Sequence, residues 1–298
     1  MAIPGKSQAH KADAHKADER GDLAAGLYIV ATPIGNARDI SLRALDVLKS
    51  CSVIAAEDTR VTAKLLAIHG IARPMVPYND HNGHQMRPKL LARLEKGEAV
   101  ALVSDAGTPL VSDPGYKLVR EVVAAGLPIV ALPGASAVLT GLALSGLPSD
   151  RFLFAGFLSS KAGERQSTLE DLKAVRATLI FFESAQRLDD SLPAMALVLG
   201  DRPAVVAREL TKLHEEVRRG MLSDLAAHYA KAGAPKGEVT VLVGPPREAV
   251  LDSAKTDAAL KAALAFMPVK AAVDLVAGLT DGSRKGLYAR ALELKDEG

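Results

Sequence analysis

Short apolar runs alternate with amphipathic segments through the first half of the chain, which is the pattern of alternating strands and helices. Between the apolar runs, hydrophobic residues recur at helical spacing, as Leu42, Leu45 and Leu48 do in a helix that we expect Asp39 to begin. This alternation predicts a parallel α/β first domain over residues 23–146. Its predicted strands are 27–32, 52–56, 75–78, 99–103 and 128–132.

The pattern changes after residue 147, where strand-like runs follow one another in a different order. Two of these runs adjoin around Glu209 and Thr211, which favours an antiparallel hairpin. We therefore expect a mixed α+β second domain over residues 147–246. Its predicted strands are 152–157, 178–182, 204–208, 213–219 and 238–243, with helices near 164–175, 185–199 and 222–231.

The two ends of the chain differ from this body. Segments 269–279 and 284–294 have helical spacing and are joined by the glycine-containing turn 280–283, so residues 255–298 predict a small helix-turn-helix-like appendage. Residues 1–22 are charged early and contain no apolar stretch, which predicts a disordered tail rather than a signal peptide. The expected fold is α/β, with two domains and a helical appendage.

Composition narrows the class of protein without identifying a partner. Hydrophobic residues make up 48% and charged residues 24% of 298, with a net charge of only +2, so any site for a polyanion must be a local patch. The single cysteine, Cys51, allows no disulfide within the chain, which fits a cytoplasmic location. The uncharged stretch 122–149 is interrupted by glycines and prolines, so we expect no membrane span.

Three loops follow predicted strands of the first domain, at residues 33–36, 104–109 and 133–136. Strands of the same polarity end at one edge of a sheet, which is where parallel α/β folds bind ligands, so we expect the loops to converge. Their glycines, prolines and small side chains let the backbone approach a ligand, and Asp105 suits a ribose diol. Dinucleotide, serine-hydrolase and zinc spacings are missing, so we predict a nucleotide-sized cofactor and no metal.

Several motifs between residues 27 and 243 are specific when taken together. They are VATPIGN (30–36), AEDTR (56–60), VSDAGTPLVSDPG (103–115), LPGAS (132–136), GLPSDRF (146–152), FES (182–184) with Arg187, and RELTKLHEE (208–216). With them the chain resembles the tetrapyrrole-methylase superfamily and, within it, the ribosomal RNA small subunit methyltransferase I family. The family's usual Phe-Tyr-Glu-Ser here reads Phe-Phe-Glu-Ser at 181–184.

The resemblance implies an S-adenosylmethionine-dependent enzyme that methylates the ribose 2′-oxygen of a cytidine near the decoding centre of small-subunit (16S) ribosomal RNA. It implies a two-domain tetrapyrrole-methylase-like fold, a homodimer, and a substrate in assembled subunits. The implied cofactor residues are Pro33, Asp105, Thr108, Ala135 and Ser136 from the first domain and Phe182 and Glu183 from the second.

A ribose hydroxyl is a poor nucleophile, so a neighbouring base or cation would assist the transfer. Candidates are Glu57, Asp58 and Arg60 after a first-domain strand, with Lys212 and Glu215 from the second domain. An interdomain ion-pair network explains the same residues equally well. Candidates for RNA contact are Arg208, Arg284, Lys285 and Arg290.

Other interpretations of the same sequence stay open. Arg60 and Lys212 also suit RNA phosphates, and the basic residues of the tail also suit a solvated helix face. Two alternative functions are a methyltransferase acting on a corrinoid or other tetrapyrrole ring, and a non-catalytic ribosomal RNA-binding assembly protein. The RELTKLHEE segment and the basic tail favour RNA over a tetrapyrrole.

Overall fold

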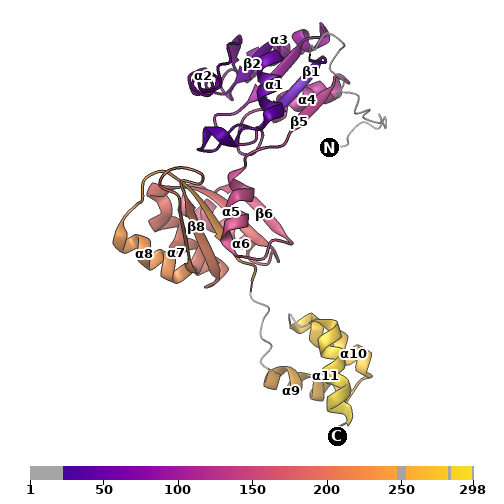
Figure 1. The fold of residues 1–298 in the computed structure, drawn as a ribbon. Helices are drawn as coiled ribbons and strands as arrows, with labels where there is room; N and C mark the ends of the chain where they lie inside the picture. The colour runs from indigo at the N-terminus through magenta and orange to yellow at the C-terminus, as the bar shows by residue number, and fades with distance from the viewer. Residues whose placement is uncertain (1–22, 247–252, 281–282, 297–298) are drawn as a thin grey trace. The chain divides into compact units, whose positions relative to one another are not determined.

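The computed structural model describes residues 23–246, 253–280 and 283–296 (Figure 1). Its contacts divide the chain into two compact units, one ending at Gly244 and the other beginning at Pro245. The first unit contains two five-stranded sheets, and the second unit contains helices only. The predicted tail at residues 1–22 lies outside the described residues.

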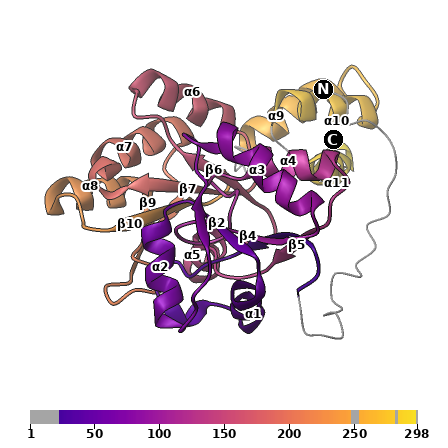
Figure 2. The same ribbon diagram turned by 90° about the horizontal axis from the view of Figure 1, so that it is seen from above.

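The first sheet is parallel throughout and has the order β3-β2-β4-β1-β5. Helices cover both faces of this sheet, α1 and α2 on one side and α3 and α4 on the other (Figure 2). Alternate residues of a strand point to opposite faces, so Leu27 packs with α3 and α4, while Tyr28 packs with α1 and α2. The elements are β1 (Gly26–Val30), α1 (Leu42–Ser50), β2 (Val53–Ala56), α2 (Thr59–Ile68), β3 (Met75–Pro77), α3 (Gly83–Glu95), β4 (Ala99–Val103), α4 (Tyr116–Ala124) and β5 (Ile129–Leu132).

The start of α1 differs from the sequence-based expectation. Asp39 ends a short 3-10 turn at Ala37–Asp39, and the helix begins only after Ser41. The Ser41 hydroxyl accepts a hydrogen bond from the Ala44 amide at 3.1 Å, so it satisfies an amide that the first helical turn leaves without a partner. Ser41, and not Asp39, is therefore the cap.

The second sheet is mixed, as the sequence predicted, with the order β6-β7-β10-β8-β9. Only β6 and β7 pair in parallel; the other neighbours are antiparallel. Helices α6, α7 and α8 cover one face around a core that includes Phe181 and Leu188. The elements are β6 (Phe152–Phe157), α6 (Ala162–Leu172), β7 (Thr178–Ser184), α7 (Leu188–Leu199), β8 (Pro203–Arg208), β9 (Glu216–Met221), α8 (Leu222–Ala232) and β10 (Glu238–Val243).

Helix α5 (Ala137–Ser145) covers the opposite face of this second sheet. Val138 and Leu142 pack there with Ile180, Val205 and Leu242. Residues 137–145 fall within the predicted first domain, 23–146, but the apolar surface of the helix completes the second core. It therefore carries the chain from one sheet to the other directly after β5.

The predicted strand at 213–219 begins three residues later, at Glu216, because residues 209–215 form a tight loop. Glu209 and Thr211 have left-handed backbones, with φ of 50° and 64°, and the Lys212 amide donates to the Glu209 carbonyl at 3.0 Å. The Thr211 hydroxyl accepts from the Asn36 amide at 3.1 Å. This loop therefore joins the second sheet to a loop of the first.

The second unit is a small three-helix bundle of α9 (Ser253–Leu264), α10 (Val269–Leu279) and α11 (Arg284–Asp296). Its core includes Leu260, Val273, Val276, Leu287 and Leu294. The predicted pair of helices is present, preceded by a helix for which the sequence suggested no separate bounds. No helix within the described part of the chain is both long and apolar enough to cross a bilayer.

Candidate active site

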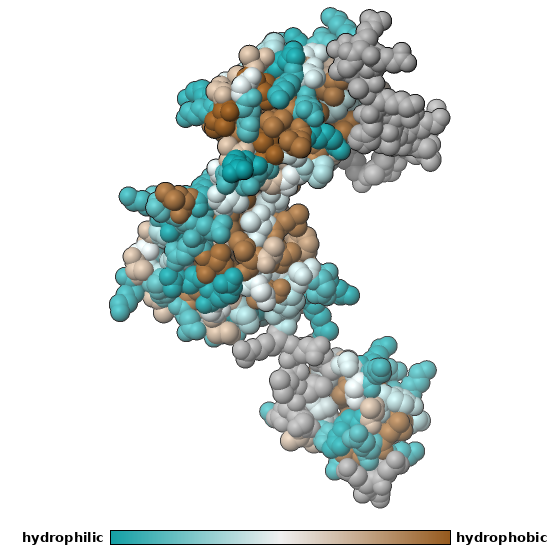
Figure 3. Space-filling model, in the orientation of Figure 1, coloured by the Kyte–Doolittle hydropathy of each residue, from teal (hydrophilic) through white to brown (hydrophobic). Residues whose placement is uncertain are grey.

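A cavity of about 760 Å³ lies within the first unit and is lined from both sheets. First-sheet loops contribute residues 106–108 and 111–113, and the start of α5 contributes Ser136 and Ala137. The second sheet contributes the ends of β6 and β7 and the turn before β10. Hydrophobic residues reach the surface of both domains of this unit (Figure 3). One residue of the cavity lining, Phe157, is 59% exposed.

The three loops predicted to converge are hydrogen-bonded to one another. Thr32, directly before the first loop, exchanges backbone hydrogen bonds of 2.8 and 3.0 Å with Gly107 of the second loop. The Thr108 hydroxyl donates to the Ala135 carbonyl at 3.3 Å, which joins the second loop to the third. The bends therefore share one rim, at the carboxyl ends of β1, β4 and β5.

The expected cofactor residues fall into two groups. Thr108, Ser136, Phe182 and Glu183 line the cavity. Pro33, Asp105 and Ala135 do not line it, but each directly precedes a residue that does. Their roles in binding stay predictions.

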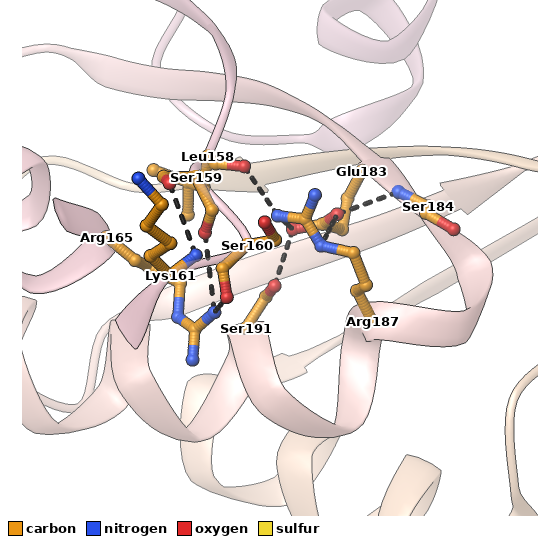
Figure 4. Close-up of polar contacts among 9 residues, drawn as sticks. All are labelled: Leu158, Ser159, Ser160, Lys161, Arg165, Glu183, Ser184, Arg187 and Ser191. Carbon is orange, nitrogen blue, oxygen red and sulfur yellow. Dashed lines mark hydrogen bonds and ion pairs between the residues drawn. The ribbon is translucent and has the colours of Figure 1, made fainter. Parts of the chain in front are cut away.

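The carboxylate of Glu183 is turned away from the cavity, toward α7 (Figure 4). It accepts hydrogen bonds from the Ser191 hydroxyl at 2.5 Å and the Ser184 amide at 2.8 Å, and pairs with Arg187 Nε at 3.2 Å. Arg187 also donates to the Leu158 carbonyl at 2.5 Å. Glu183 is only 3% exposed, and these contacts fix its side chain within the second domain.

Glu57 and Asp58 directly follow β2 and form hydrogen bonds with Asp105, which follows β4. Asp58 caps α2 and pairs with Arg60 at 2.6 Å, and hydrogen bonding from Arg60 lowers the pKa of Asp58 to about 2. Glu57 Oε2 accepts from the Asp105 amide at 3.2 Å, and Asp105 Oδ1 accepts from the Asp58 amide at 3.0 Å. Burial raises the pKa of Glu57. These residues hold two loops together and lie outside the cavity lining.

Lys212 and Glu215 also lie outside the lining. Lys212 Nζ lies 2.9 Å from Glu209 and 3.0 Å from Glu238, while a Glu215 oxygen accepts from the Thr211 amide at 2.7 Å. All of these contacts lie within the second domain, so they are not the interdomain ion pairs of the alternative interpretation. A catalytic role for either residue stays a prediction.

The predicted RNA-contacting residues differ in how far they are already engaged. Arg208 pairs with Glu216 at 3.2 Å. Arg290 forms a two-pronged contact with Asp257, at 2.9 and 2.5 Å, which ties α11 to α9. Arg284 is largely exposed and lies 3.4 Å from Asp274, and Lys285 is exposed.

Asp113 is a cavity residue that the sequence analysis did not single out, although it lies within the VSDAGTPLVSDPG motif. Burial and the neighbouring charge of Glu57 raise its pKa to about 6. The preceding Ser112 has a left-handed backbone with φ of 64°. Its position just before Pro114, in a second Asp-containing turn after β4, was the available sequence signal.

Comparison with known proteins identifies the family. A family model for tetrapyrrole (corrin/porphyrin) methylases matches residues 26–226, and one for the RsmI C-terminal HTH domain matches residues 250–295. Ribosomal RNA small subunit methyltransferase I of Mesorhizobium japonicum is 53% identical, over 92% of this chain and 94% of its own. The protein of that name in Escherichia coli O157:H7 is 45% identical, over 90% and 94%. The chain belongs to the ribosomal RNA small subunit methyltransferase I family.

Solved structures that resemble this one support the same fold at lower identity. Uroporphyrin-III C-methyltransferase from Thermus thermophilus has a TM-score of 0.54 and 23% identity, over 74% of this chain and 94% of its own. Diphthine synthase has a TM-score of 0.57 and 18% identity, over 73% and 89%. These structures confirm the predicted tetrapyrrole-methylase-like fold. The family models and the named relatives confirm the predicted family and the predicted class of enzyme, a methyltransferase.

Proposed function

We propose that this member of the family transfers a methyl group from S-adenosylmethionine to the ribose 2′-oxygen of a cytidine in 16S ribosomal RNA, near the decoding centre. The observation that carries the proposal is 53% identity to a small-subunit rRNA methyltransferase across 92% of the chain. That match spans both the α/β unit and most of the helical unit. The atom and the nucleotide come from the family resemblance.

The cavity suits this methyl donor in size and lining. About 760 Å³ falls within the ~300–1,000 Å³ typical of small-molecule sites. Thr108 and Ser136 offer hydroxyls, Gly107 offers bare backbone, and Phe182 offers an aromatic face. The donor supplies a methyl group on a sulfonium, whose departing thioether is neutral. Thr108, Ser136 and Phe182 would therefore hold it, with Pro33, Asp105 and Ala135 shaping the loops behind them.

The two sheets contribute to catalysis mainly by positioning. An in-line displacement gains up to ~7–11 kcal/mol when the reacting atoms are held in the reactive geometry. The cavity is lined from both sheets, so donor and ribose would meet between residues of the two domains. Lys236, exposed on the same lining, provides a positive charge for a phosphate.

RNA affinity is assigned to basic residues of both units. Arg284 and Lys285 are exposed at the start of α11, in the part of the chain that matches the C-terminal HTH model. Arg208 and Arg290 make ion pairs in the free protein, so their contacts with RNA would require those pairs to be shared or exchanged. We further propose a cytoplasmic homodimer that acts on assembled small subunits. Its chain would consist of an N-terminal tail (1–22), an α/β domain (23–146), an α+β domain (147–246) and a helical appendage (255–298).

Methyl transfer to competing acceptors tests this proposal. The protein is incubated with methyl-labelled S-adenosylmethionine and either purified small subunits, free 16S RNA or uroporphyrinogen III. We expect label on small subunits, recovered after nuclease digestion as 2′-O-methylcytidine. Label on the tetrapyrrole would support the ring-methylating alternative, and no label on any acceptor would support a non-catalytic assembly role.

A further inference from the structure

Among the described residues, three acidic residues belong to the cavity lining: Asp113, Glu183 and Glu238. Glu183 is held by Arg187 and Ser191, and Glu238 pairs with Lys212 at 3.0 Å. Asp113 makes no ion pair with any residue that the structure describes, and its contact is with the Ser104 hydroxyl. Of the three acidic residues, Asp113 is therefore the one whose carboxylate is not held in an ion pair and can accept a proton.

We propose that Asp113 is the general base that removes the proton from the ribose 2′-hydroxyl. This assignment rests on the proposed function, which supplies the hydroxyl. In the step, the O–H bond breaks and its proton moves to the Asp113 carboxylate. The freed oxygen pair forms the O–CH₃ bond while the C–S electron pair returns to sulfur, so a carboxylic acid, a methyl ether and a neutral thioether result.

The loop that carries Asp113 is held in a conformation that other sequences would avoid. Leu110 and Ser112 have φ of 76° and 64°, although neither is glycine. Gly115 follows with φ of 138°, and a Cβ there would lie 3.0 Å from Leu102 Cδ2. Backbone strain of this kind costs on the order of 1–3 kcal/mol per residue and concentrates at functional sites. The strained backbone therefore fixes the segment that brings Val111, Ser112 and Asp113 to the cavity, and Asp113 is the only ionisable residue of the three.

The same loop lies where both domains meet the cavity. A Cβ on Gly156, in β6 of the second sheet, would lie 3.8 Å from Ser112 Oγ. Thr108, at the other end of the loop, contacts the Ala135 carbonyl beside α5. Asp113 therefore lies between the loops expected to hold the donor and the sheet that closes the site.

The charges around Asp113 suit a base that works near neutral pH. Glu57 from the end of β2 and Asp105 from the end of β4 add negative charge that raises the pKa of Asp113, while the nearby Ser104 hydroxyl lowers it. Lys236, Glu238 and Glu183 line the cavity from the second sheet. Burial and the acidic neighbours raise the pKa to about 6, well above that of a free aspartate. A base with a pKa near the working pH combines ionisation with proton affinity.

The other acidic candidates are worse placed. Asp58 has a pKa of about 2 and is tied to Arg60, so it is a weak base. Glu57 accepts from the Asp105 amide and does not line the cavity. Glu57 is better described as a positioning residue, whose charge acts on Asp113.

The test compares Asp113→Asn, Asp113→Glu and the exposed α1 control Asp46→Asn with the wild type. Single-turnover methylation of small subunits is measured from pH 5 to pH 8, with donor affinity measured by calorimetry. We expect the wild-type rate to fall as pH drops through about 6. Asp113→Asn should lose about 10²–10⁴-fold in rate and lose that acid limb, while donor affinity is kept. Asp113→Glu should recover part of the rate together with the limb.

A second readout is independent of turnover. The carboxyl carbon of Asp113, assigned by NMR from its loss in Asp113→Asn, should titrate with a pKa near 6 in the wild type. Asp113→Asn that keeps the wild-type rate, or an Asp113 that titrates like a free aspartate, would overturn the assignment. Wild-type protein that methylates no ribosomal acceptor would instead refute the proposed function, and the role of Asp113 with it.

Discussion

At the residue scale, the composition of the site depends on the face of the sheet toward which each side chain points. In β7 (Thr178–Ser184), Phe182 lines the cavity, while the Glu183 carboxylate points to α7 and binds Ser191 and Arg187. Neighbouring residues of a strand face opposite sides, so the two side chains cannot both reach one ligand. The motif predicted that both residues contact the cofactor. The alternation of side chains along a strand indicates that only one of the two side chains faces the cavity.

Asp113 should destabilise the folded protein at neutral pH. Its folded pKa of about 6 exceeds the ordinary 3.8, so folding binds a proton between these values and stability falls as pH rises through them. Asp113→Asn removes that cost and should raise the free energy of unfolding by about 1–2 kcal/mol at pH 7.5, with a smaller gain at pH 4.5. Urea unfolding at both pH values, with Asp46→Asn as control, measures this. A variant that is less stable than wild type at pH 7.5 would contradict it.

At the element scale, the contact between Gly35 and the loop at 209–215 joins the two sheets. A Cβ on Gly35 would lie 2.4 Å from Lys212 Cγ and 2.9 Å from the Leu210 carbonyl oxygen. The strand predicted at 213–219 covers part of this loop. The left-handed Glu209 and Thr211 are tertiary features, set by packing against the first sheet, and no local pattern predicts them.

Gly35→Ala should therefore loosen this junction. The added methyl group would force the loop backbone to move, and we expect a loss of about 1–3 kcal/mol in the free energy of unfolding. Donor affinity should fall with it, since the neighbouring Ile34 lines the cavity. Gly163→Ala in α6 is the matched control, because a Cβ there meets nothing within 4 Å. Urea unfolding and calorimetry measure both effects, and equal stability of the two variants would refute the role of the junction.

At the scale of the whole molecule, the chain separates a methyl-transfer unit from a helical unit with its own core. Alternating hydrophobicity was enough to predict the parallel sheet and the mixed sheet. It did not place α5, because an uncharged helix carries no sign of which sheet it covers, and the core of Ile180, Val205 and Leu242 decides this. The cavity could be anticipated as three converging loops. The residues that line the cavity from the second domain, Phe182 and Glu183, could be predicted only through the family resemblance.

Removing the helical unit should leave donor binding intact and weaken RNA engagement. A chain ending at Pro246 keeps every residue of the cavity lining and the hydrogen bond from the Gly244 amide to the Pro203 carbonyl. We expect unchanged donor affinity, slower methylation of small subunits, and a shallower salt dependence of subunit binding as phosphate contacts are lost. An undiminished methylation rate after truncation would contradict an RNA-binding role for this unit.

A point substitution tests the same role in the full chain. Lys285→Ala should lower the slope of log affinity against log salt concentration by ~1, whereas Lys49→Ala in α1 should leave that slope unchanged.

A crystal structure of the protein with S-adenosylhomocysteine and a short cytidine-containing RNA would test the proposed site most directly. We expect the donor product in the cavity against residues 106–108 and Phe182. We also expect the acceptor 2′-oxygen within about 3 Å of the Asp113 carboxylate. A donor product bound outside this cavity, or a ribose hydroxyl held by a different carboxylate, would contradict the proposed site.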